Sequence, residues 1–404
     1  MNLLLIHPNF PGQFKLLAKE LAARDDWRVV GIGNGERSQA EASRLSYRAY
    51  EHSTGPVEPV FPLAQDFGEH ARRGRTVADL AASLRDKGFR PDVILAHPGW
   101  GDALFVPEIF PEARVIAYLE YFYRARNSDL DFDQELAVKS LDLRHVPLRN
   151  TTNLMAFAAA SRCITPTQWQ ASLFPPPIRS QLEIIHEGID TTLLAPNPAA
   201  SFQLSTGVTL TKTDEVVTYV SRSLEPYRGF HVFMRALPEL LRQRPEAQVL
   251  LVGREEVSYG QKHPSGQSWK AAMMNEVGDD LDLSRVHFLG KLAYADYLTL
   301  LQISSVHVYL TYPFVLSWSF LEAMACGCTI LGSATGPVLE VLDDGKNGRT
   351  VDFFDQAALV RTVCELLDDP GQRQRLSLAA RETVVERYDF RTRALPRYLD
   401  LLAS

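Results

Sequence analysis

Two successive series of short apolar runs alternating with amphipathic segments constrain the fold of this chain more than any other feature. The first series predicts strands over residues 3–7, 27–33, 92–97, 114–120, 163–167 and 182–190. Apolar residues at helical spacing predict helices over residues 13–25, 76–89 and 153–162. Strands that alternate with helices predict an α/β fold, in which parallel sheets carry helices on both faces.

A second series begins after a stretch rich in Pro, Asn, Ser and Thr (191–207), which is typical of a linker. Strands are predicted over residues 215–223, 247–253, 304–310 and 329–333, and helices over residues 229–244, 294–304, 319–327 and 391–404. The chain is therefore predicted to form two doubly wound domains, residues 1–195 and 208–385, followed by a C-terminal segment, 386–404.

Composition excludes several classes of function. The net charge of −7 over 404 residues argues against nucleic-acid binding as the main activity. No run approaches the roughly 20 uncharged residues of a membrane-spanning helix, and the N-terminus does not read as a signal peptide. The four cysteines lack the two-residue spacing of zinc or redox pairs, so a cytoplasmic protein is expected. There is also no Gly-rich loop ending in Gly-Lys-Ser/Thr, which excludes a P-loop NTPase at motif level.

Ligands of doubly wound folds bind beyond the carboxyl ends of the strands, so polar residues after predicted strands are the candidates for a site. In SRSLEPYRGF (221–230), Arg222 and Arg228 flank a loop between a strand and a helix start. Two guanidiniums beside a helix N-terminus suit a diphosphate. On spacing alone, it is equally plausible that both arginines simply face solvent at the surface.

The stretch PFVLSWSFLEAMACG (313–327) predicts a helix that starts at Ser319 as N-cap. Glu322 would then occupy the capping-box position, which explains the acid structurally. Alternatively, the backbone N–H groups of Ser317–Ser319 approach a phosphate and Glu322 accepts hydrogen bonds from ribose hydroxyls. Considered without the rest of the chain, the sequence around Glu322 favours the capping role over the ribose-binding role.

Three polar stretches follow strands of the first domain. HPNFPGQF (7–14) places Gly12 in a tight turn that can approach a substrate closely. HPGWG (97–101) contributes His97 and Trp100, and YLEYFYR (118–124) contributes Glu120 among aromatic residues. For each, a structural role competes evenly with a role at the substrate.

DLDFD (129–133) places three acids, Asp129, Asp131 and Asp133, at alternating positions. Such carboxylates can hold a divalent metal, as in metal-dependent nucleotide-sugar enzymes. Because the stretch is irregular, a solvated acidic face is the favoured interpretation.

Together these motifs resemble the family-4-type retaining glycosyltransferases of the GT-B fold, in which two Rossmann-like domains face each other across a cleft. In the second half, the resemblance rests on YVSRSLEPYRGF, RVHFLGKL (285–292), FVLSWSFLEAMACG and SATGPVLEVLDDGKNGRTVD (333–352). In the first half, HPNFPGQF, HPGWG, EYFY (120–123) and PTQW (166–169) are similar to a bacterial subgroup. The resemblance covers nearly the whole chain and implies that residues 386–404 form a helix crossing back to the first domain.

The resemblance implies several roles in binding a nucleotide-diphosphate sugar. Arg222 matches the diphosphate-binding Arg, and Arg228 stands where most members carry Lys, which keeps the charge and changes the hydrogen-bond geometry. Glu322 matches the ribose-binding second acid of a Glu-(seven residues)-Glu motif. Gly12 would lie near the donor phosphates or the acceptor. The residues expected beside the nucleobase are Phe288, Gly290 and Lys291.

The chain departs from the family pattern at two positions. Phe314 stands where the first acid of that motif is expected, so backbone groups of Leu316, Ser317 and Trp318 would replace it, or sugar recognition differs. Glu120 stands where many members carry a catalytic His, so Glu120 and His97 share the polar role in this interpretation.

The implied activity is metal-independent transfer of a sugar from a UDP- or GDP-linked donor to a hydroxyl acceptor, with retention at the anomeric carbon. No cofactor is expected beyond the donor substrate. The acceptor would be a glycan, a lipid-linked sugar or a small molecule, and a location at the inner face of the membrane stays open. Three rival hypotheses stay open. They are a metal-dependent transferase using Asp129, Asp131 and Asp133, a non-catalytic nucleotide-sugar-binding module, and a GT-B epimerase or phosphorylase.

Overall fold

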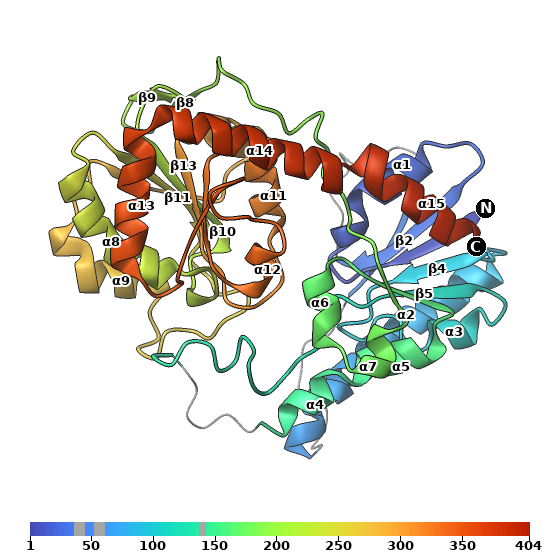
Figure 1. Ribbon diagram of the computed structural model, residues 1–404. Helices are drawn as coiled ribbons and strands as arrows, with labels where there is room; N and C mark the ends of the chain where they lie inside the picture. The colour runs from blue at the N-terminus through green and yellow to red at the C-terminus, as the bar shows by residue number, and fades with distance from the viewer. Residues whose placement is uncertain (36–44, 52–60, 137–142) are drawn as a thin grey trace. The chain divides into compact units, whose positions relative to one another are not determined.

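A computed structural model describes residues 1–35, 45–51, 61–136 and 143–404 of the chain (Figure 1). The chain divides into two compact units. The first unit comprises Met1–Gly188 together with Phe390–Ser404, and the second comprises Ile189–Asp389. The C-terminal residues from Phe390 therefore group with the N-terminal part of the chain, and the division falls at Gly188, ahead of the stretch predicted as a linker.

Among the described residues, seven strands form the sheet of the first unit, in the order β3-β2-β1-β4-β5-β6-β7. All neighbouring strands are parallel. The bounds are β1 Asn2–Ile6, β2 Arg28–Asn34, β3 Ser46–Tyr50, β4 Val93–Ala96, β5 Arg114–Tyr118, β6 Arg162–Thr165 and β7 Leu182–Ile184. The order reverses between β1 and β4, and at such a switch point the loops after the two strands diverge and leave room for a ligand.

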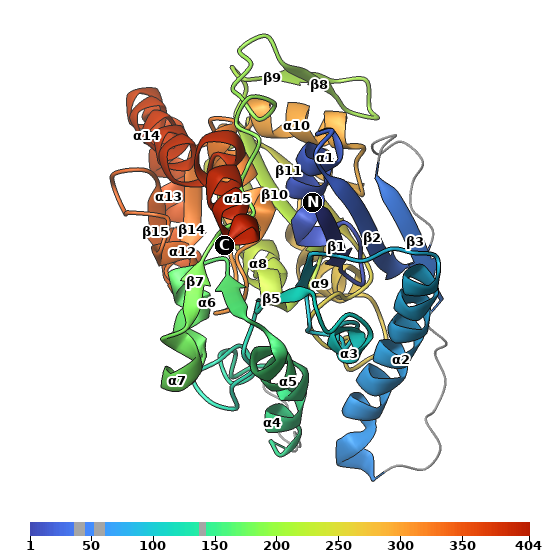
Figure 2. The same cartoon turned by 90° about the vertical axis from the view of Figure 1, so that its right-hand side faces the viewer.

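Helices cover both faces of this sheet, because consecutive residues of its central strands β1 and β4 are apolar and buried. Leu3 and Leu5 of β1 pack with α1 and α15, whereas Leu4 and Ile6 pack with α2 and α3. Both termini of the chain lie in this unit, and Figure 2 shows α15 beside α1. The α-helices are α1 Lys15–Ala22, α2 Gln65–Asp86, α3 Val106–Ile109, α4 His145–Arg149, α5 Thr151–Ala159, α6 Gln168–Leu173, α7 Pro176–Arg179 and α15 Leu395–Ala403.

The second unit contains a sheet of six parallel strands within the described ranges, in the order β12-β11-β10-β13-β14-β15. Its strands are β10 Val216–Ser223, β11 Gln248–Arg254, β12 Val286–Gly290, β13 Val306–Tyr309, β14 Ile330–Ser333 and β15 Arg349–Val351. The order reverses between β10 and β13, so the loops after β10 and β13 meet the same criterion for a ligand site.

Helices α10, α11, α12 and α14 pack on one face of the second sheet, and α13 packs against α8. The helices are α8 Phe230–Gln243, α9 Trp269–Val277, α10 Tyr294–Ile303, α11 Trp318–Ala325, α12 Gly336–Leu339, α13 Gln356–Asp368 and α14 Pro370–Tyr388. The prediction of two Rossmann-like, doubly wound domains is thereby confirmed.

The stretch predicted as a linker is built into the second unit instead. Ser201–Gln203 (β8) pairs with Thr209–Thr211 (β9) in an antiparallel hairpin. Phe202, Leu204 and Leu210 are buried in the core of that unit. The Pro, Asn and Ser residues therefore mark turns around a small hairpin, and its few apolar side chains hold it against the core.

Two other element predictions differ from the structure. The helix predicted from residue 76 begins at Gln65 in the structure. The prediction started too late because the first half of the helix is polar and lacks the apolar period by which helices are recognised. The strand predicted over 182–190 ends at Ile184. The edge strand β3 was not predicted, because its sequence SYRAY is mostly polar and carries no alternation strong enough to detect.

Candidate functional site

Two histidines lie at the switch point of the first sheet, each just after a strand. His7 follows β1 and His97 follows β4. Each Nδ1 accepts a hydrogen bond from the backbone N–H two residues later, Asn9 N at 3.0 Å and Gly99 N at 3.2 Å. Because Nδ1 is the acceptor in both rings, the proton of each neutral imidazole is on Nε2.

A chain of side-chain hydrogen bonds links these histidines through Glu120, which follows β5. His97 Nε2 lies 3.1 Å from Glu120 Oε2. Gln13 Nε2 donates to Glu120 Oε1 at 2.5 Å, and His7 Nε2 lies 2.5 Å from Gln13 Oε1. The main-chain oxygen of Glu120 accepts from Gln170 Nε2 at 2.6 Å. The predicted residues His97 and Glu120 are thus in contact, and their partners His7 and Gln13 come from the stretch HPNFPGQF, of which only Gly12 was predicted as a site residue.

The electrostatic state of the relay follows from burial. His7 is 3% exposed, and loss of hydration lowers its pKa to about 3. Neighbouring His97 acts in the same direction, and the Gln13 hydrogen bond opposes it. His7 is therefore neutral at ordinary pH. The Glu120 side chain keeps 21% of its surface exposed, whereas His97 beside it keeps 4%, so a ligand can reach the carboxylate.

Gly12 is required by the His7 ring. Its φ of +49° lies in the left-handed region, and a Cβ atom placed there would come within 2.3 Å of His7 Cε1. The predicted glycine is thereby explained by packing within the relay. Trp100 lies beside His97, with ring centroids 4.9 Å apart, and is 38% exposed.

In the second unit, Arg228 is buried next to the first turn of α11. Its Nη1 donates to Tyr309 Oη at 3.1 Å, Thr311 Oγ1 at 2.6 Å and Val315 O at 3.0 Å. The Tyr309 hydroxyl also accepts from Ser317 N at 2.8 Å. Arg228 is thereby oriented at a helix N-terminus, where backbone N–H groups and positive charge favour an anion.

Arg222 is exposed on β10 and makes no side-chain hydrogen bond or ion pair within the described part of the chain. Below it, the buried Glu225 accepts the backbone N–H groups of Ser258, Tyr259 and Gly260. Glu225 thus fastens the segment after β11 to the β10 loop. The alternative that both arginines are solvated is wrong for Arg228 and fits the exposure of Arg222.

The predicted start of α11 is wrong by two residues. Ser317 is the N-cap, with extended backbone angles, and its hydroxyl accepts from Ser319 N at 3.4 Å. Glu322 therefore lies beyond the capping-box position. Its carboxylate accepts instead from Tyr297 Oη at 2.6 Å and Tyr294 Oη at 3.1 Å. Glu322 is therefore not a capping residue. Its carboxylate is oriented by two tyrosine hydroxyls of the neighbouring helix α10.

Phe314 lies in an aromatic cluster beside Arg228. Its ring centroid is 5.5 Å from Tyr227 and 5.1 Å from Tyr259, and the Arg228 guanidinium carbon lies 6.0 Å from it. The neighbouring Leu316 and Trp318 flank the N-cap, and Trp318 is 41% exposed. An apolar aromatic surface thus occupies the place where the family pattern has an acid.

The three residues predicted beside the nucleobase lie at the end of β12. Phe288 carries Lys270 Nζ 4.8 Å from its ring centroid. Gly290 has a φ of +61° and open space at its Cβ position, and Lys291 is exposed. Since α10 starts at Tyr294, this strand end leads directly to the tyrosines that hold Glu322.

The acidic stretch 129–133 shapes its own loop. Asp129 and Asp133 are buried, so the prediction of a solvated acidic face is wrong for both. Asp129 accepts from Tyr121 Oη at 2.8 Å, Asp131 accepts the N–H groups of Asn127 and Ser128, and Asp133 accepts the N–H of Glu135. Buried carboxylates are tolerated here because hydrogen bonds satisfy them.

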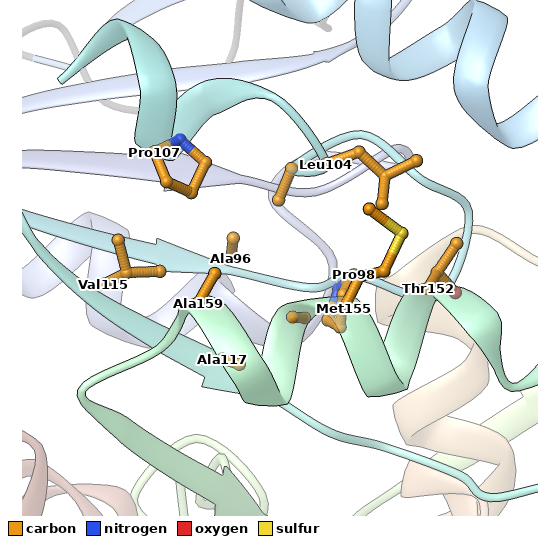
Figure 3. A pocket seen from close by; sticks show the side chains of 11 residues that line it. Ala96, Pro98, Leu104, Pro107, Val115, Ala117, Thr152, Met155 and Ala159 are labelled. Carbon is orange, nitrogen blue, oxygen red and sulfur yellow. The ribbon is translucent and has the colours of Figure 1, made fainter. Parts of the chain in front are cut away.

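An apolar pocket lies elsewhere in the first unit, between β4, β5, α3 and α5 (Figure 3). Thr152 is the one hydroxyl-bearing residue in its lining, and Met155 points across it. It contains none of the predicted site residues. Within the described ranges, no helix combines the length and the apolar character that a membrane crossing requires.

Two family models match the chain. Residues 25–194 match the "Glycosyl transferase family 4 group", and residues 204–383 match the "Glycosyl transferases group 1". Over 243 residues the chain is 28% identical to a GDP-mannose-dependent alpha-(1-6)-phosphatidylinositol monomannoside mannosyltransferase of Mycolicibacterium smegmatis, covering 58% of this chain and 59% of that protein. It is also 28% identical over 220 residues to a glycogen synthase of Mycobacterium tuberculosis, covering 54% and 48%. The chain thus spans about half the length of the curated relatives it matches.

Solved structures resemble the whole chain. A sucrose-phosphate synthase from Thermosynechococcus elongatus aligns with a TM-score of 0.74 and 18% identity, covering 100% of this chain and 99% of that one. Anabaena HepE, solved in complex with UDP and glucose, aligns with a TM-score of 0.72 and 17% identity over 100% of both chains. At these identities the likeness establishes the fold.

Proposed function

Because this chain belongs to the family-4-type glycosyltransferases of the GT-B fold, we propose that it transfers a sugar from a nucleotide-diphosphate sugar to a hydroxyl acceptor. The donor is UDP- or GDP-linked, in line with the GDP-mannose named for one relative and the UDP bound in one structural neighbour. The anomeric configuration is retained, and no metal takes part.

The buried Arg228 carries this proposal. Every hydrogen bond that its guanidinium makes to a described residue runs through Nη1, which leaves Nε and Nη2 as donors for a ligand. The N-terminus of α11 lies beside it through the shared Tyr309 hydroxyl. A departing nucleotide diphosphate gains negative charge, and preorganised positive groups of this kind stabilise such charge. Arg222, exposed and free of partners among the described residues, supplies the second charge.

We assign the other contacts with the nucleotide sugar to residues of the second unit. Glu322 accepts ribose hydroxyls, and its two tyrosine partners hold the carboxylate in one orientation. Phe288, Gly290 and Lys291 lie beside the nucleobase. The backbone from Leu316 to Ser319 contacts the phosphates and the sugar. In the first unit, His97 and Glu120 supply the catalytic polar groups, of which Glu120 is the partly exposed carboxylate, and Gly12 lies near the donor phosphates or the acceptor.

The chemical step breaks the bond between the anomeric carbon and the phosphate oxygen and forms a bond to the acceptor oxygen on the same face. The acceptor's proton passes to an oxygen of the leaving phosphate. The balance therefore needs neither a cofactor nor a protein nucleophile. Arg222 and Arg228 stabilise the leaving diphosphate in place of a metal.

The test compares two exposed arginines of the second unit. Arg222→Ala should lower sugar transfer from UDP- or GDP-linked donors by roughly a hundredfold with an unchanged melting temperature. Arg361→Ala, on the exposed side of α13, should retain wild-type activity. Near-normal transfer by Arg222→Ala contradicts the phosphate assignment.

Two further measurements distinguish the rival functions. Transfer abolished by EDTA and restored by manganese supports the metal-dependent alternative that uses Asp129, Asp131 and Asp133. Calorimetric binding of nucleotide sugars without turnover over a broad acceptor panel supports a non-catalytic module.

A further inference from the structure

We propose that Gln13 is a positioning residue that holds the Glu120 carboxylate in its working orientation, and that His7 in turn fixes the orientation of the Gln13 amide. This inference rests on the proposed function, because it gives Glu120 its place at the reacting centre. Both residues belong to the stretch HPNFPGQF (7–14), in which the sequence analysis gave a role to Gly12 alone. The observation behind it is the relay of side-chain hydrogen bonds from His7 through Gln13 to Glu120.

The direction of every bond in the relay is determined. Asn9 N–H donates to His7 Nδ1, so the neutral ring carries its proton on Nε2 and donates to Gln13 Oε1. With its oxygen turned to His7, the Gln13 amide must present its NH₂ group to Glu120 Oε1. The opposite amide orientation would set oxygen against carboxylate and N–H against N–H.

His7 suits this task because it does not change its charge in the working range of pH. It is buried between Phe14, His97 and Trp100, with ring centroids at 5.9, 5.1 and 6.3 Å. Gly12 leaves the room that the ring needs. A neutral, Nε2-protonated ring is a donor of fixed direction, whereas a hydroxyl or an exposed amide in its place could rotate.

Glu120 receives one donor on each oxygen, Gln13 on Oε1 and His97 on Oε2. Both donors lie at one end of a partly exposed side chain, and each carboxylate oxygen retains a second lone-pair direction. Those directions are the ones available to a substrate hydroxyl. A carboxylate clamped from two sides loses its rotational freedom before the ligand arrives, which favours the reacting geometry.

The alternative is that Gln13 only stabilises the turn after β1. Stabilising the turn and positioning Glu120 predict different results when Glu120 itself is substituted. A turn-stabilising Gln13 would matter equally whether or not Glu120 carries a charge. A positioning Gln13 would matter only while Glu120 is present as the group to be positioned.

A double-mutant cycle makes this distinction. Gln13→Leu should lower kcat by roughly tenfold or more, with little change in the KM for the nucleotide sugar, because a hydrogen bond to a charged group is lost. In a Glu120→Gln background the same substitution should lower kcat less than twofold further. Gln181→Leu is the matched control and should match wild type, because this glutamine is exposed and its side chain bonds, among the described residues, the Pro177 carbonyl alone. Equal losses in both backgrounds overturn the positioning role.

A second measurement does not depend on activity. Nitrogen-15 NMR of histidine-labelled protein should show His7 as the neutral Nε2-protonated tautomer at pH 6, and Gln13→Leu should shift its Nε2 resonance. A charged ring or the Nδ1-protonated tautomer overturns the relay. If wild-type protein transfers no sugar from any donor while this NMR result holds, the proposed function fails and the relay stands.

Discussion

The hydroxyl of Tyr309 lies 3.1 Å from Nη1 of Arg228, and the same hydroxyl accepts the backbone N–H of Ser317. One oxygen at the end of β13 thus joins the buried guanidinium to the first turn of α11. Together with the bonds from Arg228 to Thr311 and Val315, this oxygen fixes the guanidinium relative to a helix start that lies about 90 residues away in the chain.

Tyr309→Phe should weaken the proposed diphosphate site around Arg228 without abolishing it. Arg228 keeps Thr311 and Val315 as acceptors, whereas Ser317 N loses its partner. We expect a loss of about 1–3 kcal/mol in the free energy of unfolding and a severalfold rise in the KM for the nucleotide sugar. Urea unfolding and steady-state kinetics measure the two effects.

The control for this variant is Tyr398→Phe. The Tyr398 hydroxyl is buried, and among the described residues it has no hydrogen-bond partner. Its removal should leave both stability and KM close to wild type. If the two variants behave alike, the hydroxyl of Tyr309 has no special role.

Acid should destabilise the protein through two buried histidines, one in each unit. Burial lowers the pKa of His7 to about 3, assisted by His97 and opposed by Gln13, and burial alone lowers the pKa of His307 to about 3. Between that value and the ordinary 6.5, the unfolded chain binds protons that the folded chain does not. Stability therefore falls as pH drops from about 6.5 towards 3 and is insensitive to these groups above that window.

At pH 4.5, each histidine should lower the free energy of unfolding by roughly 2–3 kcal/mol relative to pH 7. Urea unfolding of the His7→Gln and His307→Gln variants at both pH values checks this. Each substitution should reduce the difference in unfolding free energy between pH 4.5 and pH 7, because glutamine does not titrate. A difference as large as that of the wild type in both variants would assign the acid sensitivity to other groups.

Phe314→Glu should change which donor sugars are accepted. The ring of Phe314 lies beside Arg228 and Tyr259, where a sugar joined to a bound diphosphate would contact this unit. A carboxylate there can accept sugar hydroxyls that an aromatic ring cannot. We expect the ratio of kcat/KM for fully hydroxylated hexose donors over deoxy-sugar donors to rise severalfold.

Competition assays with mixed nucleotide sugars measure that ratio directly. Phe314→Leu keeps the surface apolar and should preserve the wild-type preference. An active Phe314→Glu enzyme with unchanged preference would show that the donor sugar does not contact this position.

Much of the fold was predictable because its determinants are local. Leu3, Leu4, Leu5 and Ile6 form a run without polar interruption, as a strand buried on both faces requires. The hairpin around Phe202 was missed, because only contact with the core distinguishes its apolar residues from those of a linker. The start of α11 was misjudged because Ser317 and Ser319 are equally good caps by type, and the backbone angles decide between them.

The sequence by itself determined the two α/β series, their parallel strands and the positions of polar residues after those strands, because apolar periodicity acts over a few residues. Only the tertiary structure decided which of these polar residues meet. Gln13 and Glu120 are 107 positions apart, and Tyr297 reaches Glu322 from another helix. Such contacts are set by how strands and helices pack, since a hydrogen bond depends on ångström distances and carries no trace in the local pattern of either partner.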